Sequence, residues 1–307
     1  MSYSMPPPHA DQHSASCYSP PELAEFARQY AADGVVRVPG LLAGDWVARL
    51  TRSVERARTD LTQLRVATNP VLGPAAAPAA RTHAYPTAEH STAPGRCTIR
   101  WLWRDVPEVR AFFTDSGVAP VVAAIISARR LQYWFDLTFM HDPGAEGEGT
   151  PWHHDIAAFP CKGQQIPSLW IALNDVDADM SPLGCIRGSH RNPAMFRPPV
   201  YVEQQGMLPP GYADLPDVAA RIASGEYEVL NWQIRAGDAL LIHPYTLHGA
   251  PPNRSPRPRI AFTTRWAGDD VVWAPDALSM KVPGVDLAQV PRGARPEGEF
   301  FPYAMKT

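Results

Sequence analysis

The second half of the chain is dominated by short apolar segments of a kind typical of β-strands. From Arg130 onward these segments are rich in aromatic and β-branched residues, and each is bounded by Gly, Pro, Asp or Asn. The segments are "LQYWFDLTFMH", "SLWIALNDV", "GDALLIHPYTLHG" and "RIAFTTRWAGDDVVW". Their length and spacing predict an all-β core, a sandwich or a barrel, with helices packed against its outside.

The first half of the chain has helical character. Residues 19–34 and 43–61 are amphipathic, and Ser19 is placed to cap the first of these helices. Residues 35–42 between them are expected to form a strand. Residues 105–127 predict two short helices that separate near Gly117.

Two stretches are expected to lie outside this framework. Residues 1–19 are polar and proline-rich, which predicts a flexible N-terminal arm. Residues 67–96 are rich in Ala, Pro and Thr without a clear period, which predicts a long loop and a candidate lid. The remaining chain, residues 20–307, is then expected to form one domain, with the helical part leading into the β core.

The bulk composition excludes several classes of function. An apolar content of 45% is ample for a core, while a net charge of −3 and a pI near 6.4 argue against a nucleic-acid or polybasic membrane binder. No signal peptide is evident, and the longest apolar run, "VAPVVAAII", is too short to span a bilayer. The four cysteines form no CxxC pair. We therefore expect a cytoplasmic protein with free thiols; its oligomeric state stays open.

One stretch, "TPWHHDIAAFP", brings together three side chains that are able to bind a metal ion. On an extended backbone, the side chains of His153 and Asp155 point the same way, because they are two residues apart. His154 then points to the other face. Two ligands do not make a site, so the interpretation depends on a third ligand elsewhere in the chain.

A second histidine cluster follows between predicted strands and supplies that ligand. The turn after His248 is rich in Pro, Asn and Arg, and the next strand opens at Arg259. If the two strands pair as a hairpin, His248 lies near Arg259 across the ladder. His153, Asp155 and His248 would then form a facial 2-His-1-carboxylate set, which leaves the opposite side of a metal ion open.

At this point the sequence resembles the phytanoyl-CoA dioxygenase family. The stretches that carry the resemblance are "TPWHHD", "SLWIALNDVDADMSPLGCIRGSHR", "LHGAPPNRSPRPRIAFTTRWAGDD" and "EGEFFPYAM". It extends from about Glu22 to Phe301. The HxD motif alone is weak evidence for the family. The HxD motif, the GSH loop and a later histidine–arginine pair, in that order, are specific to it. The resemblance implies a double-stranded β-helix, also called a jelly roll or cupin-like fold, with Fe(II), 2-oxoglutarate and O2 as cofactor and co-substrates.

The resemblance also implies roles for individual residues. Its metal ligands fall on His153, Asp155 and His248. Its 2-oxoglutarate anchor falls on Arg259, and a guanidinium suits the bidentate binding of a carboxylate. Further contacts of the co-substrate fall on two residues, Trp170 and Thr138.

The chain departs from the family pattern at two places. His141 stands where relatives often carry a lysine. Ser181, Pro182 and Arg187 stand around the GSH loop, where relatives often have a glycine and a proline. Neither departure removes a ligand, but both affect the expected contacts of substrate and co-substrate.

Four more residues are candidates for substrate contact, each with a structural alternative. His154 is a candidate for the pocket wall or the surface. Trp101 and Trp103 are candidates for a substrate platform or for the core. Arg265 is expected on the same strand face as Arg259, either near the site or in an ion pair.

The expected reaction is hydroxylation of an unactivated C–H bond in a small organic molecule, such as a specialised metabolite, with release of succinate and CO2. A carboxylate at Asp155 closes the chloride site that related halogenases open with Ala or Gly. Desaturation, epoxidation or rearrangement at the same iron site remains an alternative. A cupin-like protein that binds a metal or ligand without turnover is an alternative of another class, although such a protein has no use for Arg259.

Overall fold

The computed structural model describes residues 18–66, 87–93, 95–144, 149–198, 210–276, 278–283, 285 and 290–306. Most of the predicted N-terminal arm and residues 67–86 of the candidate lid lie outside these ranges. The end of the predicted loop is not loop, however, because strand β3 (Glu89–Ala93) and the start of β4 (Arg96–Arg100) fall within it. The sequence of β3, EHSTA, lacks the alternation that marks a strand, whereas RCTIR of β4 alternates over only five residues. Pairing of the two strands with each other and of β4 with β5 supports both.

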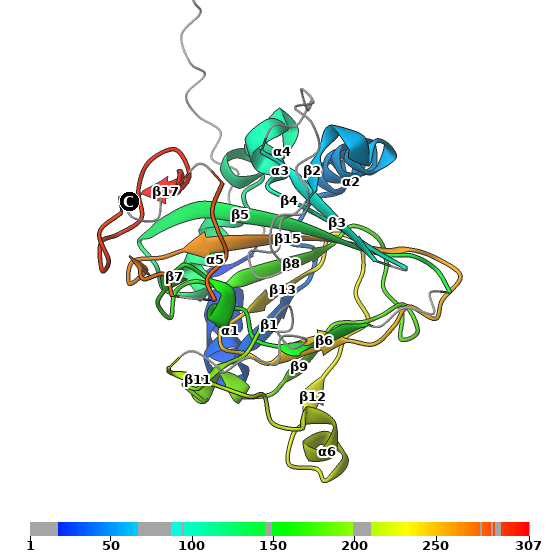
Figure 1. Ribbon diagram of the computed structural model, residues 1–307, viewed down its shortest axis with the longest axis vertical. Helices are drawn as coiled ribbons and strands as arrows, with labels where there is room; N and C mark the ends of the chain where they lie inside the picture. Colours follow the sequence, from blue (N-terminus) through cyan, green and yellow to red (C-terminus); the bar gives the residue numbers. More distant parts are fainter. Residues whose placement is uncertain are drawn as a thin grey trace, which may run out of the picture.

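Two sheets face each other and form the core of the molecule (Figure 1). Within the described residues, the large sheet has nine strands, in the order β1 (Val35–Val38), β13 (Ala239–Ile242), β8 (Ser168–Ala172), β15 (Arg259–Ala267), β5 (Arg130–His141), β4, β3 and β2 (Arg65–Val66), with β17 (Tyr303–Lys306) also on β5. The small sheet has the order β12 (Val229–Leu230), β9 (Gly184–Ile186), β14 (His248–Ala250) and β6 (Thr150–His153). Almost every pair of neighbouring strands is antiparallel. The arrangement confirms the predicted double-stranded β-helix.

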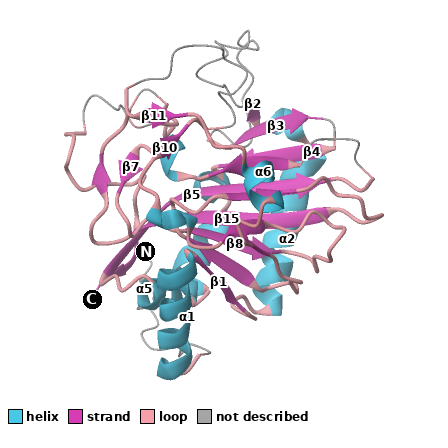
Figure 2. Ribbon diagram, turned by 90° about the horizontal axis from the view of Figure 1, so that it is seen from below, coloured by secondary structure: helices cyan, strands magenta, loops and turns pink. Residues whose placement is uncertain are grey.

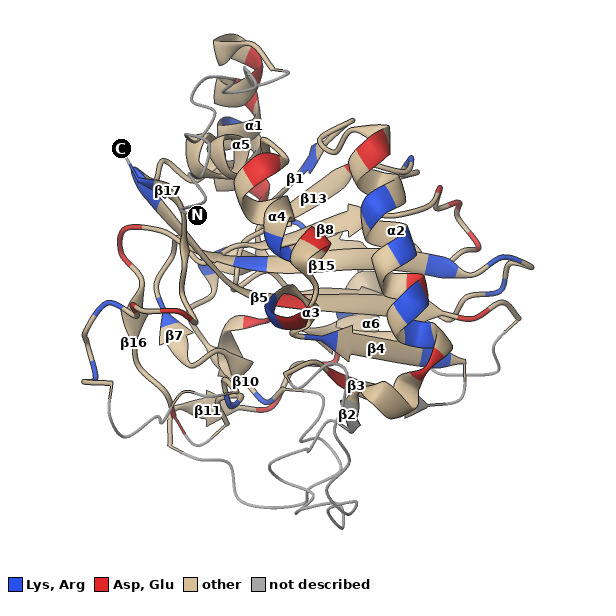
Figure 3. Cartoon of the chain, turned by 90° about the horizontal axis from the view of Figure 1, so that it is seen from above, with Lys and Arg blue, Asp and Glu red and all other residues tan. Residues whose placement is uncertain are grey.

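All described helices except α6 (Val218–Ala223) pack on the outer face of the large sheet, while α6 lies beside β12 of the small sheet. The helices on the large sheet are α1 (Pro20–Asp33), α2 (Gly44–Thr59), α3 (Leu102–Asp105), α4 (Pro107–Asp115) and α5 (Val118–Ile125). Figures 1 and 3 show α2, α3 and α4 over β4, β5 and β15, and Figure 2 shows α1 and α5 side by side. Phe112 of α4 packs edge-on against Phe262 of β15, with 5.5 Å between ring centroids. The predicted helices in residues 19–34, 43–61 and 105–127 are confirmed.

The alternation of side chains along β15 separates two interiors. Ile260, Phe262 and Trp266 pack beneath the helices. Arg259 and Arg265, on the opposite face, line a cavity between the two sheets. One strand therefore contributes apolar residues to the helical side and cationic residues to the space enclosed by the sheets.

Short connections complete the fold. The remaining strand pairs are β7 (Cys161–Lys162) with β16 (Val272–Trp273) and β10 (Met195–Phe196) with β11 (Tyr212–Ala213), and the 3-10 turns are η1 (Leu61–Gln63), η2 (Ile156–Ala158) and η3 (Ser189–Arg191). Cys97, Cys161 and Cys185 are buried and free. In the part of the chain that the structure describes, no helix is long and apolar enough to cross a membrane.

Candidate metal centre

Two neighbouring strands of the small sheet bring His153 and His248 together. Strand β14 pairs with β6 in antiparallel register, and the Cα atoms of His248 and His153 lie directly opposite each other. The two imidazole rings lie 4.2 Å apart, centroid to centroid. The ladder therefore fixes the separation of two side chains that are 95 residues apart in the sequence, 248 − 153.

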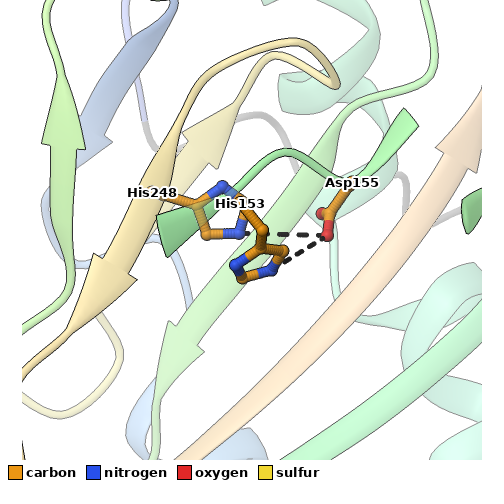
Figure 4. Close-up of side chains that lie close together, drawn as sticks. All are labelled: His153, Asp155 and His248. Atoms are coloured by element: carbon orange, nitrogen blue, oxygen red, sulfur yellow. Dashed lines mark ion pairs between the residues drawn. The ribbon is translucent and has the colours of Figure 1, made fainter. Parts of the chain in front are cut away.

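Asp155 completes the cluster from just beyond the end of β6. Its Oδ1 atom lies 3.7 Å from Nε2 of His153 and 3.9 Å from Nε2 of His248 (Figure 4). The predicted reason for this proximity is wrong, because Asp155 is not on extended backbone. It has helical angles, φ −78° and ψ −34°, and it precedes the η2 turn. This turn, and not strand alternation, directs the carboxylate back towards the two rings.

Backbone carbonyls orient both imidazoles. Nδ1 of His153 lies 2.8 Å from the carbonyl oxygen of Pro151, and Nδ1 of His248 lies 3.0 Å from that of Thr246. A carbonyl only accepts, so each Nδ1 carries a proton, and each Nε2 is the nitrogen that faces Asp155 and is available to a metal. Burial, followed by the nearby His153, lowers the pKa of His248 to about 4, which keeps that ring neutral.

The second oxygen of Asp155 is held by two other side chains. Nη2 of Arg265 lies 3.1 Å from Oδ2, and the hydroxyl of Ser168 donates a short hydrogen bond to the same atom. Burial raises the pKa of Asp155, but attraction to the Arg265 cation, together with the hydrogen bond from Ser168, outweighs it. The pKa therefore lies well below its ordinary value, and the group is a carboxylate. Because Oδ2 is engaged, Oδ1 is the oxygen that remains free for a cation.

A cavity between the sheets connects this cluster to Arg259. The residues that line it are Phe139, Thr150, His153, Asp155, Ser168, Trp170, Leu183, Ile242, His248, Arg259, Thr263 and Arg265. The prediction that His248 and Arg259 are neighbours across a hairpin is wrong. Strand β14 pairs with β6 and β9, whereas β15 pairs with β5 and β8. The two residues face the same cavity from opposite sheets, because the Pro-rich connection crosses between the sheets.

The structure places Arg259 in a nearly dry environment. The side chain is 1% exposed, and burial lowers the pKa of its guanidinium to about 10, so it is still a cation. Its Cζ atom lies 5.8 Å from the ring centroid of Trp170, which also lines the cavity. Among the described residues, no hydrogen-bond acceptor meets Nε of Arg259. A buried cation with an unused donor suits an anionic ligand.

Four predicted contact residues lie away from this cavity. Thr138 pairs with Phe262, and its strand neighbour Phe139 is the residue that faces the cavity, so Thr138 points towards the helical side. Trp101 and Trp103 are 2% and 1% exposed and pack in hydrophobic clusters, so the core alternative holds for both.

His154 is buried and not on the surface. Its Nε2 accepts a hydrogen bond of 3.0 Å from the backbone N–H of Phe196, and its ring is not part of the cavity lining. Arg265, by contrast, lies at the cluster itself, in the ion pair with Asp155 described above.

Sequence reasoning did not single out Ser168. It stands two residues before Trp170 on β8, and the period of two along a strand places both side chains on the cavity face. That spacing was readable in the sequence, but its significance depends on the position of Asp155, which local pattern does not reveal.

The donor set fits a ferrous ion. In the part of the chain that the structure describes, one group of three or more His, Cys, Asp or Glu side chains could hold a metal ion. It consists of His153, Asp155 and His248, whose ligand atoms all lie within 4.8 Å of one another. Two imidazole nitrogens and one carboxylate oxygen on one side of a cavity match the 2-His-1-carboxylate pattern of non-heme iron sites.

Comparisons with known proteins agree with this geometry. No curated protein matches the chain. The fold resembles that of the epimerase SnoN from nogalamycin biosynthesis, solved with Fe3+ and alpha ketoglutarate, with a TM-score of 0.68, 19% identity, and coverage of 93% of this chain and 100% of that one. For the carbocyclase SnoK from the same biosynthesis, the TM-score is 0.65 and the identity 20%, with coverage of 91% of this chain and 95% of that one. For EctD from S. alaskensis, solved with 2-oxoglutarate and 5-hydroxyectoine, the TM-score is 0.61 and the identity 15%, with coverage of 94% of this chain and 89% of that one.

At these identities the similar structures show the fold alone, and the family assignment comes from the sequence. The profile of the phytanoyl-CoA dioxygenase (PhyH) family matches residues 30–261. Because this match spans well over half of the 307-residue chain, the protein belongs to the phytanoyl-CoA dioxygenase (PhyH) family.

Proposed function

We propose that the protein is an Fe(II)- and 2-oxoglutarate-dependent dioxygenase that hydroxylates an unactivated C–H bond of a small organic molecule. The observation that carries this proposal is the pairing, in one cavity, of a two-histidine, one-carboxylate cluster with a buried arginine. A protein that only binds a metal has no need of the second feature. An isolated buried guanidinium costs several kcal/mol unless an anion meets it.

Five of the residues that line the cavity have a direct role in this proposal. His153, Asp155 and His248 would hold the iron through Nε2, Oδ1 and Nε2. Arg259 binds the distal carboxylate of 2-oxoglutarate, and Trp170 forms the adjacent wall. When bound, the iron would supply, with O2, the oxidising power for C–H cleavage, and 2-oxoglutarate would be converted to succinate and CO2. The protein positions the target carbon and excludes water.

The substrate is inferred from the character of the cavity wall. Phe139, Leu183 and Ile242 provide apolar surface next to the iron ligands. This favours a small, mostly apolar or amphipathic metabolite and argues against nucleic acid, polymer or membrane as the partner. We further propose that residues 20–307 act as one catalytic domain.

The outcome of the reaction depends on where the substrate sits. Asp155 occupies the position that a halide would need, which favours oxygen transfer over halogenation. Desaturation, epoxidation or rearrangement is the second candidate. Proteins of the same fold are named as an epimerase and as a carbocyclase, so this scaffold supports several fates of the substrate.

The proposal is tested by metal binding and co-substrate turnover. His153→Ala and Asp155→Ala should each abolish either Fe(II) binding under anaerobic conditions or 2-oxoglutarate decarboxylation in air. Asp45→Ala on the exposed surface of α2 is the control and should leave both unchanged. Wild-type turnover by either variant would refute the ligand set. A mass-spectrometric screen of metabolites for a product heavier by one oxygen atom then identifies the substrate.

Arg259→Ala separates an oxygenase from a binding protein. It should keep Fe(II) binding but raise the 2-oxoglutarate concentration for half-maximal decarboxylation by 100-fold or more, on the order of a lost buried charge pair. An unchanged requirement would place the anchor elsewhere. Absence of CO2 release from the wild type with every metabolite tried would favour a binding protein without turnover.

A further inference from the structure

His141 and Ser181, two of the residues at which the sequence departs from the family pattern, are in contact with each other, and His141 also contacts Arg259. His141 is the last residue of β5, and its Cα is paired with that of Arg259 on β15. Its Nε2 lies 2.9 Å from Nη2 of Arg259, and its Nδ1 lies 3.1 Å from the hydroxyl oxygen of Ser181. His141 is 3% exposed and Ser181 is fully buried, so water does not replace these contacts.

The directions of the hydrogen bonds that link Ser181, His141 and Arg259 follow from the number of protons that Ser181 can donate. The hydroxyl of Ser181 has a single proton, and it donates at 2.6 Å to the carbonyl oxygen of Pro251, which can only accept. The contact between Ser181 and His141 must therefore run from Nδ1–H to the hydroxyl oxygen. This leaves a lone pair on Nε2 of His141, which accepts from Nη2–H of Arg259.

His141 and Ser181 are also held in place by their own backbone surroundings. Asn253 donates at 3.1 Å to the backbone carbonyl of His141, which fixes the end of β5. Ser181 has φ +54°, a left-handed conformation that is unfavourable for a serine, and this brings its hydroxyl between His141 and Pro251. His141 and Ser181 are thus each restrained by a contact that does not involve Arg259.

We infer that His141 is a positioning residue for Arg259, and that Ser181 fixes the imidazole tautomer that allows it. The inference rests on the proposed function, because it assigns to Arg259 the binding of 2-oxoglutarate. The neutral ring occupies one edge of the guanidinium and prevents its rotation. The remaining donors, including the unpaired Nε, are then oriented before the co-substrate arrives.

Two substitutions of nearly equal length test the inference. His141→Gln keeps an acceptor near the position of Nε2, whereas His141→Met has similar size but presents only a weak sulfur acceptor. Calorimetric titration of the anaerobic Fe(II)-loaded protein with 2-oxoglutarate should give a dissociation constant raised roughly tenfold or more for His141→Met and less than about threefold for His141→Gln. The affinity for Fe(II) should be unchanged in both, which excludes general misfolding.

Ser181→Gly tests the hydrogen bond between Ser181 and His141. Glycine tolerates the positive φ at position 181, so the hydroxyl is lost without backbone strain. The dissociation constant of 2-oxoglutarate should rise to a value between those of the two His141 variants. The kcat at saturating 2-oxoglutarate should stay within about twofold of the wild type for all three variants, because binding of the co-substrate, and not chemistry, is altered.

Three outcomes overturn the inference. If His141→Met binds 2-oxoglutarate like the wild type, His141 does not position Arg259. If His141→Gln loses as much affinity as His141→Met, packing and not the acceptor is responsible. If the wild type itself binds no 2-oxoglutarate, the proposed function fails as well, which distinguishes that failure from the other two.

Discussion

Asp155 shows how a charged ligand is kept ready in a nearly dry site. It is 8% exposed, and a carboxylate in that environment is costly unless it is paired. Arg265 and Ser168 satisfy Oδ2 and leave Oδ1 for the metal. An aspartate fixed in this way does not need to rotate when the metal binds, so its partners contribute to affinity through orientation.

Loss of Arg265 should therefore destabilise the metal-free protein. Arg265→Met leaves Asp155 buried without its cation, and we expect the free energy of unfolding to fall by about 3 kcal/mol. In the double variant Arg265→Met/Asp155→Asn, the buried negative charge is also gone, and most of the loss should be recovered. Urea denaturation of the metal-free proteins measures both values. Equal losses in the single and the double variant would mean that Arg265 acts through packing.

At the level of elements, the metal centre depends on the close approach of β6 to β14. Gly149 immediately precedes β6, and a Cβ atom built on it would lie 2.0 Å from the backbone oxygen of Ala250. That obstacle is main chain, so no side-chain rotation relieves it. The absence of a side chain at position 149 thus allows the ladder that aligns His153 with His248.

Gly149→Ala should weaken the metal site without touching a ligand. Pushing β6 away from β14 is expected to cost about 2 kcal/mol of stability and to lower the Fe(II) affinity at least tenfold, because the two rings separate. Gly44→Ala is the matched control, since nothing lies within 4 Å of its Cβ position and it begins helix α2. This control should be neutral or slightly stabilising. Wild-type iron affinity in Gly149→Ala, measured by anaerobic titration, would contradict the account.

Local pattern in the sequence was sufficient for the elements that depend on local chemistry. The helix at residues 20–33 begins where Glu22 accepts a hydrogen bond from the backbone N–H of Ser19, and it ends at Gly34, which has φ +79°. Along β15, a period of two separates Arg259 from Phe262. These features involve residues a few positions apart, which is the range that propensity and periodicity describe.

The features that could not be predicted depend on contacts between distant parts of the chain. A Pro-rich connection after a strand predicts a hairpin, but here it crosses from β14 in one sheet to β15 in the other. The helical backbone of Asp155 is likewise set by its surroundings, since the N–H of the next residue, Ile156, donates to the carbonyl of Pro244. Nothing in the sequence next to Asp155 indicates this partner.

For the whole molecule, the position of the cavity between two sheets explains why charged residues at its centre are tolerated. The helices and the large sheet enclose one apolar layer, and the cavity lies on the other side of that sheet. Substitutions in the cavity can be made without opening the hydrophobic layer that contains Phe112 and Phe262.

The same burial makes the stability of the molecule depend on pH. Burial, with His190 nearby, lowers the pKa of His243 to about 3 from an ordinary 6.5. Between these values the unfolded chain binds a proton at this position and the folded protein does not. The contribution of His243 is therefore complete above pH 6.5 and is lost as the pH falls towards 3. Burial raises the pKa of Asp136 to about 7, so that group acts in the opposite direction, and its stabilising effect is lost as the pH rises to 7.

Because these effects oppose each other, only a difference between two proteins isolates one of them. His243→Asn keeps an acceptor for the backbone N–H of Tyr245, which donates to Nδ1 of the native ring at 3.3 Å, but it removes the titration. Between pH 6.0 and 4.5, the unfolding free energy of the wild type should fall relative to this variant by about 1.4 kcal/mol per pH unit, the value for one proton. Urea denaturation of the metal-free proteins over this range gives the slope, and parallel curves would show that His243 is protonated in the folded state.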